Sequence, residues 1–265
     1  MKVEILNPEA LQNLYKNHGE FACVCYNTPS EKAEQVGKNC QQSGHLSGSR
    51  CEYIKFKISD VDRGTAEQIM RHEIGTSIPI EYQDNYSFAD FAEAVKDVSP
   101  DQIVKNMASF RYIDKTGFSW VTPWAIRSVS KAKQRYDALM DHINAERIAI
   151  KEMLESSGIK PGIANEAVNF TLPRATKSEL VVGFTPEAFV HFCHKRLCSR
   201  AQEYIRQFAK LAKDECARYC PEYAAELKPH CEHLLWCPEG SHCCGHLPTK
   251  KKLMELLQYG AEVAA

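Results

Sequence analysis

Around residue 70 the chain reads Gln68-Ile69-Met70-Arg71-His72-Glu73-Ile74-Gly75. An amide, a guanidinium, an imidazole and a carboxylate follow an apolar Ile-Met pair within two helical turns. Gln68 precedes Arg71 by three residues and His72 by four, so these side chains share one face of a predicted helix. Such a face suits an anionic, planar ligand. The alternative is that Arg71 and Glu73 are ordinary surface charges and that His72 is a satisfied surface histidine.

A second polar motif, Asn106-Met107-Ala108-Ser109-Phe110-Arg111-Tyr112, is the predicted partner of the first. The two are separated by a polar, acidic stretch in which 88–95 has a helical pattern and Ser99-Pro100 reads as a helix cap. We therefore expect two halves of one site, divided in the sequence by about thirty residues.

Composition bounds the class of protein. Of 265 residues, 44% are hydrophobic and 25% are charged, which is typical of a globular chain. The net charge of -1 gives no broad positive field for a nucleic-acid polymer. No apolar run approaches the roughly 20 residues that span a bilayer, and the N-terminus lacks a secretory signal. We expect a cytoplasmic protein without a membrane partner, whose twelve cysteines are thiols or metal ligands rather than a disulfide framework.

The first quarter of the chain has the patterns of short strands and helices. Alternating residues predict a strand over 1–6 and a half-buried strand over Glu52–Ile58, with Ile54, Phe56 and Ile58 on one face. Asp60 or Asp62 is the predicted cap of the helix that carries Gln68. Further predictions are a helix over Glu9–Lys16, a buried segment over Phe21–Tyr26, and a polar helix over Glu31–Ser43 that ends at Gly44.

The later chain is predicted to be mainly helical. A long helix runs from about Ala125 to Ser157, with its apolar residues in the core, and a shorter one over Ile163–Phe170 stops before Pro173. The segment 178–184 suits a strand or an extended link. A helix opened by Pro186 continues to about Arg218 and lines the core, with Arg196 reaching inward.

The tail after residue 215 is rich in cysteine and histidine. Thiolates and imidazoles near the turn Cys237-Pro238-Glu239-Gly240 are zinc-ligand types, although their spacing fits no standard finger. A disulfide or a cluster of free thiols is the favoured alternative. The weak metal candidates are Cys231, Cys237, Cys243 and Cys244, and Lys250–Lys252 reads as a solvated charge run.

An ordered set of motifs covers nearly the whole chain: His45-x-Ser47, Gln68-x-x-Arg71-His72, Asn106-x-x-Ser109-x-Arg111-Tyr112, Leu172-Pro173, and Arg196 followed by Ala201-Gln202 and Ile205-Arg206. In this order and spacing the chain resembles the flavin-dependent thymidylate synthases. The tail Cys237-Pro238-Glu239-Gly240 is similar to that of some bacterial members. The resemblance predicts an α+β fold in which a small mixed sheet packs with long helices, a catalytic domain over 1–215, and the tail over 216–265.

The resemblance also implies an activity. Members of the family are homotetramers that bind FAD and dUMP, take a one-carbon unit from methylenetetrahydrofolate, reduce the flavin with NADPH and release dTMP. The predicted partners are therefore dUMP, folate and NADPH. Arginine forks and a hydroxyl suit a nucleotide phosphate, and a guanidinium beside a uracil ring would make its carbon 5 a better nucleophile.

The resemblance assigns roles to individual residues. Catalysis is assigned to Arg196 and Ser109. Positions that match nucleotide-binding residues are Gln68, Arg71, Ser109, Arg111 and Arg196, with His45 near the folate and nucleotide. Positions that match flavin contacts are Ser47, Arg71, His72, Ile74 and Asn106, together with His191, where the family often has asparagine, and Cys25, where it often has serine.

Three positions depart from the family pattern. Glu73 stands where a second arginine is usual and Met107 where a glutamate is usual, and we hypothesise that these two changes are linked. Asn169 stands where a nucleotide-binding arginine is expected, so Asn169 or the neighbouring Arg174 takes that place. An insertion, Ile78–Lys105, divides the motif and would act as a lid, as a subunit contact, or by reshaping the pocket.

These departures keep two alternatives open. One is a sister flavoenzyme that modifies a related pyrimidine nucleotide, for example by hydroxymethylation. The other is a non-catalytic, metal-binding structural or interaction protein with the same fold, motivated by the altered arginines and the Cys/His tail.

Overall fold

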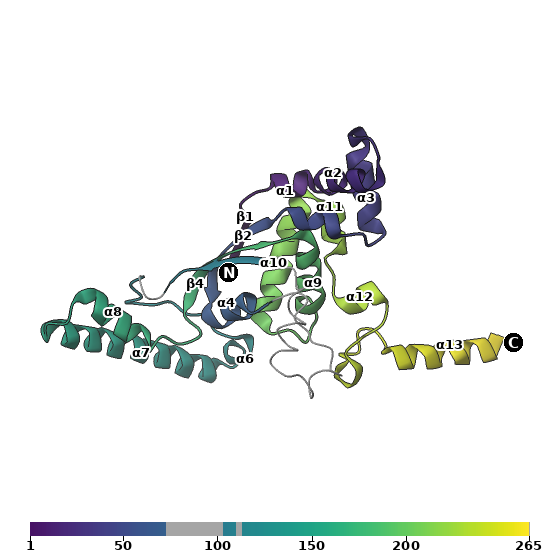
Figure 1. Cartoon of the computed structure of the whole chain (residues 1–265). Coiled ribbons are helices and arrows are strands. Elements are labelled where there is room, and N and C mark those ends of the chain that lie inside the picture. Colours follow the sequence, from purple (N-terminus) through teal and green to yellow (C-terminus); the bar gives the residue numbers. More distant parts are fainter. Residues whose placement is uncertain (73–102, 110–112, 265) are drawn as a thin grey trace, which may run out of the picture.

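A four-stranded antiparallel sheet lies at the centre of the computed structural model, which describes residues 1–72, 103–109 and 113–264 (Figure 1). The strand order is β1-β2-β4-β3. In β4 (Lys177–Phe184), Val182 lies opposite Phe56 of β2 (Ile54–Asp62), and Val181 lies opposite Asn106 of β3 (Ile103–Met107). β1 (Lys2–Ile5) covers the outer edge of β2. The sheet and its helices confirm the α+β prediction, but the predicted mixed sheet is wrong for the described residues, since all three strand pairs are antiparallel.

β2 forms where the alternation predicted it. Ile54, Phe56 and Ile58 are completely buried on one face, whereas Lys55 points to solvent. The register shifts between Ile58 and Val61, and Asp60 adopts a φ of 57°, which a β-bulge accommodates. The strand then leads directly into α4 (Arg63–Met70).

Two helices cover the apolar face of the sheet. In α9 (Pro186–Arg196) and α10 (Glu203–Tyr219), Phe189 and Phe208 lie 4.9 and 6.2 Å from the Phe56 ring, centre to centre. The prediction of one helix from 186 to about 218 is wrong. The chain leaves the helix after Arg196, and a second helix starts at Glu203, where the Gln202 side chain caps it by accepting hydrogen bonds from the backbone N–H groups of two following residues.

The N-terminal helices pack beside this core. They are α1 (Glu9–Gln12), α2 (Leu14–Tyr26) and α3 (Ala33–Gln42), with 3₁₀ turns η1 (Ser30–Lys32) and η2 (Ser47–Cys51). α2 can cross α3 closely because Gly19 has no Cβ. A Cβ at this position would lie only 1.6 Å from the Ala33 carbonyl oxygen. The segment 21–26 was predicted to be buried, which is only partly correct: Ala22 and Cys23 are buried, but Val24 is 83% exposed. The reason is that the segment is helical and packs only one face against the core.

A helical hairpin projects from one side of the molecule (Figure 1). It consists of α7 (Ser130–Ser156) and α8 (Pro161–Asn169), preceded by the short α6 (Trp124–Arg127). The predicted helix over 125–157 is thus interrupted at 128–129. Its apolar residues were predicted as core, which is wrong for this single chain: Met140 is buried, whereas Leu139, Ile150 and Met153 are exposed. They lie outside the core because the hairpin extends away from the sheet.

The tail forms short elements and one terminal helix. These are α11 (Pro221–Glu226), α12 (His230–Leu234), η4 (Gly240–His242) and α13 (Lys250–Ala264). α13 projects into solvent on the side of the molecule opposite the hairpin (Figure 1). Within the described ranges, no helix combines the length and apolar character that crossing a membrane requires.

Candidate functional site

The C-terminal end of α4 carries the first motif. Asp62 caps the helix by accepting the Thr65 backbone N–H at 2.8 Å, as one of the two predicted caps. After Met70 the chain turns, which leaves Gln68 half-buried, Arg71 exposed and His72 buried.

Lys105 joins this helix end to the second motif. From β3, its ammonium group donates to the backbone oxygens of Met70 at 2.7 Å and His72 at 2.8 Å. Carbonyl groups at a helix C-terminus attract cations, so the contact stabilises the junction. The structure therefore brings the two motifs together, as the sequence predicted. Lys105 was missed, although its place immediately before Asn106 could have drawn attention to it.

His72 is a neutral imidazole in a buried place. Its ring meets the Phe192 ring edge-on at 4.9 Å. Burial, together with the positive charges of Arg196, Lys195 and Lys105, lowers the pKa of His72 to about 3. Its Nε2 is buried without a hydrogen-bond partner in the described part of the chain. This nitrogen is therefore available to form a hydrogen bond with a bound molecule. Until it does, the buried polar atom lowers the stability of the fold.

Arg196 approaches the same place from the end of α9. The side chain is half-buried, and burial lowers its pKa, but a guanidinium stays charged in proteins. Its Nε is also buried and unpaired among the described residues. Two orphaned polar atoms from distant segments, one cationic and one neutral, form a place suited to an anionic or polarised ring.

A cavity beside α2 collects three predicted residues. Cys25, His45 and Ser47 line a volume of about 390 Å³ between α2 and η2. His18, which the sequence analysis did not single out, lines the same cavity, and its Nε2 lies 2.9 Å from the backbone oxygen of His45. This hydrogen bond fixes the loop that presents His45 and Ser47.

A second cavity lies beside α8. Asn169 and Arg174 line it, together with Arg63 and Glu67 of α4, and its volume is about 390 Å³. The Glu67 carboxylate lies 3.2 Å from both the Arg63 and the Arg174 guanidinium groups. Arg63 and Glu67 were missed by sequence reasoning, although their i,i+4 spacing on a capped helix is a recognisable ion-pair signal.

The remaining predicted residues are more scattered. Asn106 in β3, Ser109 after it and His191 on α9 are exposed. Ile74 and Arg111 lie outside the described residues, as do Glu73 and the predicted insertion up to 102. The linked change of Glu73 and Met107 therefore stays a hypothesis. Met107 itself contacts Arg63, whose Nη1 lies 3.6 Å from the thioether sulfur.

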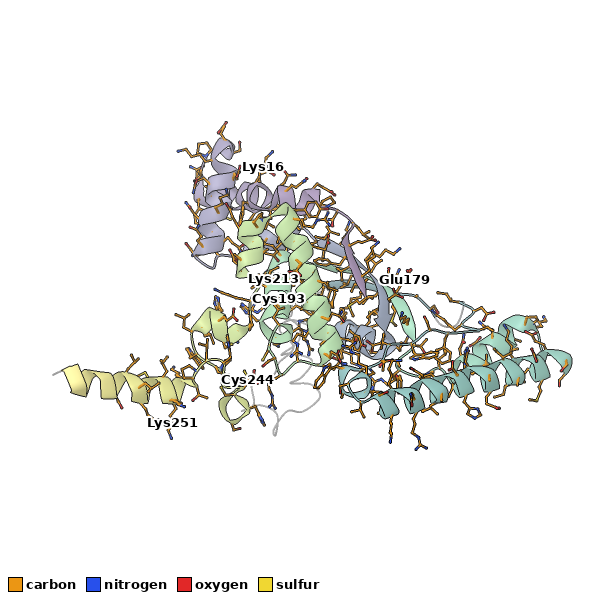
Figure 2. All side chains as sticks on the ribbon, turned by 180° about the vertical axis from the view of Figure 1, so that it is seen from behind. Lys16, Glu179, Cys193, Lys213, Cys244 and Lys251 are labelled. Carbon is orange, nitrogen blue, oxygen red and sulfur yellow. The ribbon has the colours of Figure 1, made fainter. Side chains whose placement is uncertain are left out.

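The cysteines predicted as weak metal ligands lie on α12 and in the segment after it. Cys231 and Cys237 are buried, Cys243 is half-buried and Cys244 is exposed. Figure 2 shows Cys244 near the base of the terminal helix and Cys193 beside α10. Every cysteine whose side chain is described is a free thiol. In the same part of the chain, no group of three or more His, Cys, Asp or Glu residues could hold a metal ion.

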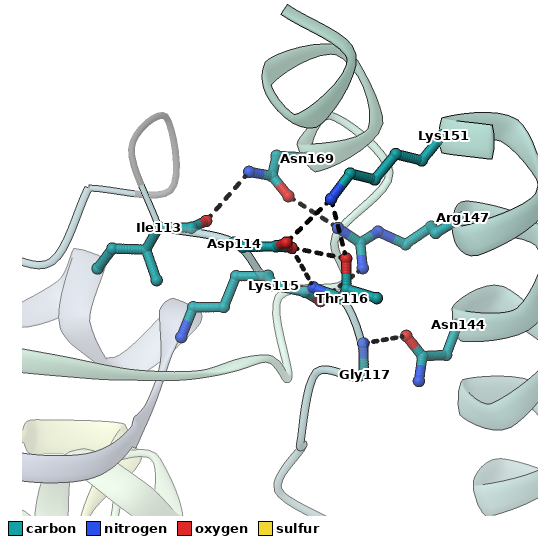
Figure 3. A network of polar contacts seen from close by, with 9 residues as sticks. All are labelled: Ile113, Asp114, Lys115, Thr116, Gly117, Asn144, Arg147, Lys151 and Asn169. Carbon is teal, nitrogen blue, oxygen red and sulfur yellow. Dashed lines mark hydrogen bonds and ion pairs between the residues drawn. The ribbon is translucent and has the colours of Figure 1, made fainter. Parts of the chain in front are cut away.

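A buried arginine on α7 was also missed. Arg147 is 2% exposed, and its Nη2 donates to Asn169 Oδ1 at 2.7 Å (Figure 3). The sequence signal was present, since Asn144, Arg147 and Lys151 recur at helical spacing, but the prediction for this helix used its apolar positions alone.

Comparisons with known proteins agree with this arrangement. Residues 10–222 match the model of the family described as thymidylate synthase complementing protein. A flavin-dependent thymidylate synthase of Nitratidesulfovibrio vulgaris is 36% identical over 188 residues, which cover 68% of this chain and 76% of the relative. Enzymes of that name from Geobacter sulfurreducens and Thermococcus onnurineus are 25% and 26% identical, over 79% and 74% of this chain and 75% and 69% of the relatives. The chain therefore belongs to the thymidylate synthase complementing protein family, the family of the flavin-dependent thymidylate synthases.

Proposed function

We propose that this protein converts dUMP to dTMP, with methylenetetrahydrofolate as one-carbon donor and NADPH as reductant, through FAD. The observation that carries the proposal is the pair formed by His72 and Arg196. Each has a buried ring or guanidinium nitrogen without a partner in the part of the chain that the structure describes, and both belong to the motifs that resemble the family. Family membership and these orphaned donors support the same assignment.

The residues present fit a flavin. A neutral imidazole can form a hydrogen bond with a flavin ring without bringing a competing charge, and the low pKa of His72 keeps it neutral at physiological pH. Ser47, Arg71, Asn106, His191 and Ile74 are the further residues proposed to hold it, with Cys25 at the rim of the α2 cavity. Bound FAD would supply the hydride chemistry, while the protein orients the reactants.

The nucleotide is proposed to lie against Arg196. A half-buried guanidinium stabilises negative charge that develops on a pyrimidine ring, which raises the nucleophilicity of carbon 5. Gln68, Arg71, Ser109 and Arg111 would bind the remaining nucleotide, with His45 toward the folate. A cysteine nucleophile is unnecessary, and burial raises the pKa of Cys193, the cysteine within α9, so that its thiol is a poor nucleophile.

The same residues support a homotetramer. The cavity at α2 and the cavity at α8 lie on different parts of one chain, and both views of the molecule separate these helices (Figures 1 and 2). A site assembled from residues this far apart would be completed by neighbouring copies. We therefore propose that Arg174 of one copy binds a nucleotide held by another.

The first experiment is an absorbance spectrum of the purified protein. A flavin band that bleaches with NADPH under anaerobic conditions, followed by formation of dTMP from dUMP and methylenetetrahydrofolate, is the expected result. Flavin with a hydroxymethylated product would favour the sister activity. A colourless protein that binds neither flavin nor dUMP would refute the proposal and favour a structural role.

A further inference from the structure

We propose that Arg147, acting through Asn169, is a positioning residue of the nucleotide site that holds the backbone presenting Ser109. The inference rests on the proposed function and extends it. The family resemblance expects an arginine at position 169 that contacts the nucleotide. We infer instead that the Asn169 amide stabilises the loop beside the site.

Burying the charged side chain of Arg147 is costly. Its guanidinium donates to three neutral acceptors: Asn169 Oδ1 at 2.7 Å, the Lys115 backbone oxygen at 2.9 Å and the Val168 backbone oxygen at 3.3 Å. The guanidinium carbon also lies 5.4 Å from the centre of the Phe118 ring. A buried cation held by neutral groups is unfavourable unless all its donors are satisfied. Arg147 thus links α7, α8 and the loop 113–117 rigidly.

The hydrogen bonds continue from Arg147 through Asn169 to Ile113 (Figure 3). Asn169 Nδ2 donates to the Ile113 backbone oxygen at 3.5 Å, and the Ile113 N–H donates to the Ser109 backbone oxygen at 3.2 Å. The amide of Asn169 therefore uses its oxygen toward Arg147 and its nitrogen toward the loop. An arginine at position 169 could not accept the first bond, because a guanidinium has no acceptor.

One face of α7 anchors the rest of the loop. Asn144 Oδ1 accepts the Gly117 N–H at 3.1 Å, and the Lys151 ammonium lies 2.9 Å from Asp114. Asp114 also accepts the Thr116 N–H at 2.8 Å, and its hydrogen bonds with Thr116 and Lys151 lower its pKa to about 2. The loop is therefore fixed along its length by a rigid helix, which is how a scaffold pre-organises residues that bind a ligand.

Asn169→Asp separates the two bonds of residue 169. Aspartate still accepts from Arg147 but cannot donate to Ile113, so the fold should keep its Tm while Ser109 loses its support. We expect the KM for dUMP to rise about tenfold, as for one lost hydrogen bond, with kcat and bound FAD unchanged. Arg147→Lys should raise the same KM, since a lysine can satisfy fewer of the three acceptors.

Lys133→Met is the matched control. It lies on α7 as well, but its ammonium group pairs with Asp137 of the same helix rather than with the loop, and the KM for dUMP should stay within about twofold of the wild type. An equal rise in this control would overturn the proposal in favour of a general effect of changing α7. Asn169→Asp with an unchanged KM would overturn it too.

Asn169→Arg tests the direct role. If arginine tightens dUMP binding, residue 169 faces the nucleotide and the positioning role is wrong. Weaker binding with a lower Tm is the expected result, because two guanidinium groups would meet. These outcomes are distinguishable from failure of the proposed function, in which the wild-type protein itself would bind no flavin and no dUMP.

Discussion

His72 and Arg196 come from distant parts of the chain, yet each has a buried nitrogen in the same region with no hydrogen-bond partner among the described residues. A buried donor without a partner typically destabilises the fold by about 1–3 kcal/mol, and a purely structural role would give no compensating hydrogen bond. We expect Arg196→Ala to lower kcat by at least about a hundredfold, as for loss of one charge-stabilising donor, while FAD content stays the same. Steady-state kinetics and the flavin absorbance check this, with the exposed Arg200→Ala as control. Retained turnover would show that another residue contacts the pyrimidine.

The low pKa of His72 makes stability depend on pH. Its pKa is about 3 in the folded chain, against an ordinary value of 6.5, so the unfolded chain binds a proton that the folded chain does not over this window. Stability should be complete above pH 6.5 and fall as the pH drops toward 3, by at most about 1.4 kcal/mol per pH unit for this group. Urea denaturation at several pH values should show a shallower dependence for His72→Gln than for the exposed control His142→Gln. Parallel curves would mean that other groups dominate.

Local residue chemistry was the most predictable part of the molecule. The alternation of Ile54, Phe56 and Ile58 gave the buried face of β2, and Asp62 was one of two predicted caps of α4. Both depend on neighbours in the sequence. The contacts of Arg147 and Lys105 could not be foreseen in this way, since their partners lie more than twenty residues away and become neighbours only after the sheet and the hairpin have formed.

At the scale of elements, helix ends were the main source of error. Apolar periodicity continued across 128–129 and 197–202, so each region was predicted as one helix. In the structure α9 ends at Arg196 and α10 starts afresh behind its cap Gln202, and this break places Arg196 at a helix terminus. β3 was missed because it is an edge strand whose pairing with β4 is not visible in its own sequence.

The junction of α4 with β3 is an element-scale contact that can be tested. Lys105→Met would remove the ammonium group from the carbonyls of Met70 and His72. Hydrogen bonds to a charged group are worth about 1.5–3 kcal/mol, so we expect the free energy of unfolding to fall by about 1–2 kcal/mol. Flavin should also bind more weakly, because His72 would lose its support. Chemical denaturation and flavin titration measure both, beside Lys55→Met on the exposed face of β2. Two unchanged values would indicate that the junction is held by packing alone.

At the scale of the whole molecule, the α7–α8 hairpin has an apolar face that the single chain leaves exposed. Its apolar positions fall at helical spacing, as expected of a core helix, but Leu139 is 51% and Met153 is 61% exposed, and Phe170 at the end of the hairpin is 88% exposed. Sequence periodicity reports that a face will be buried; it does not say by which molecule. The family resemblance supplies an answer, since a homotetramer would cover this face with other copies.

We therefore expect a charge on this face to dissociate the assembly. Leu139→Asp would place a carboxylate where the proposed tetramer buries a leucine, and an unpaired buried charge costs several kcal/mol, enough to shift the equilibrium toward smaller species. Size-exclusion chromatography with light scattering gives the mass, and circular dichroism shows whether the helices persist. Glu146→Gln on the exposed side of α7 is the matched control. Because Arg174 at the base of the hairpin is proposed to bind the nucleotide of a neighbouring copy, dTMP formation should fall together with the tetramer. A folded, fully active tetramer of Leu139→Asp would place the subunit contact elsewhere.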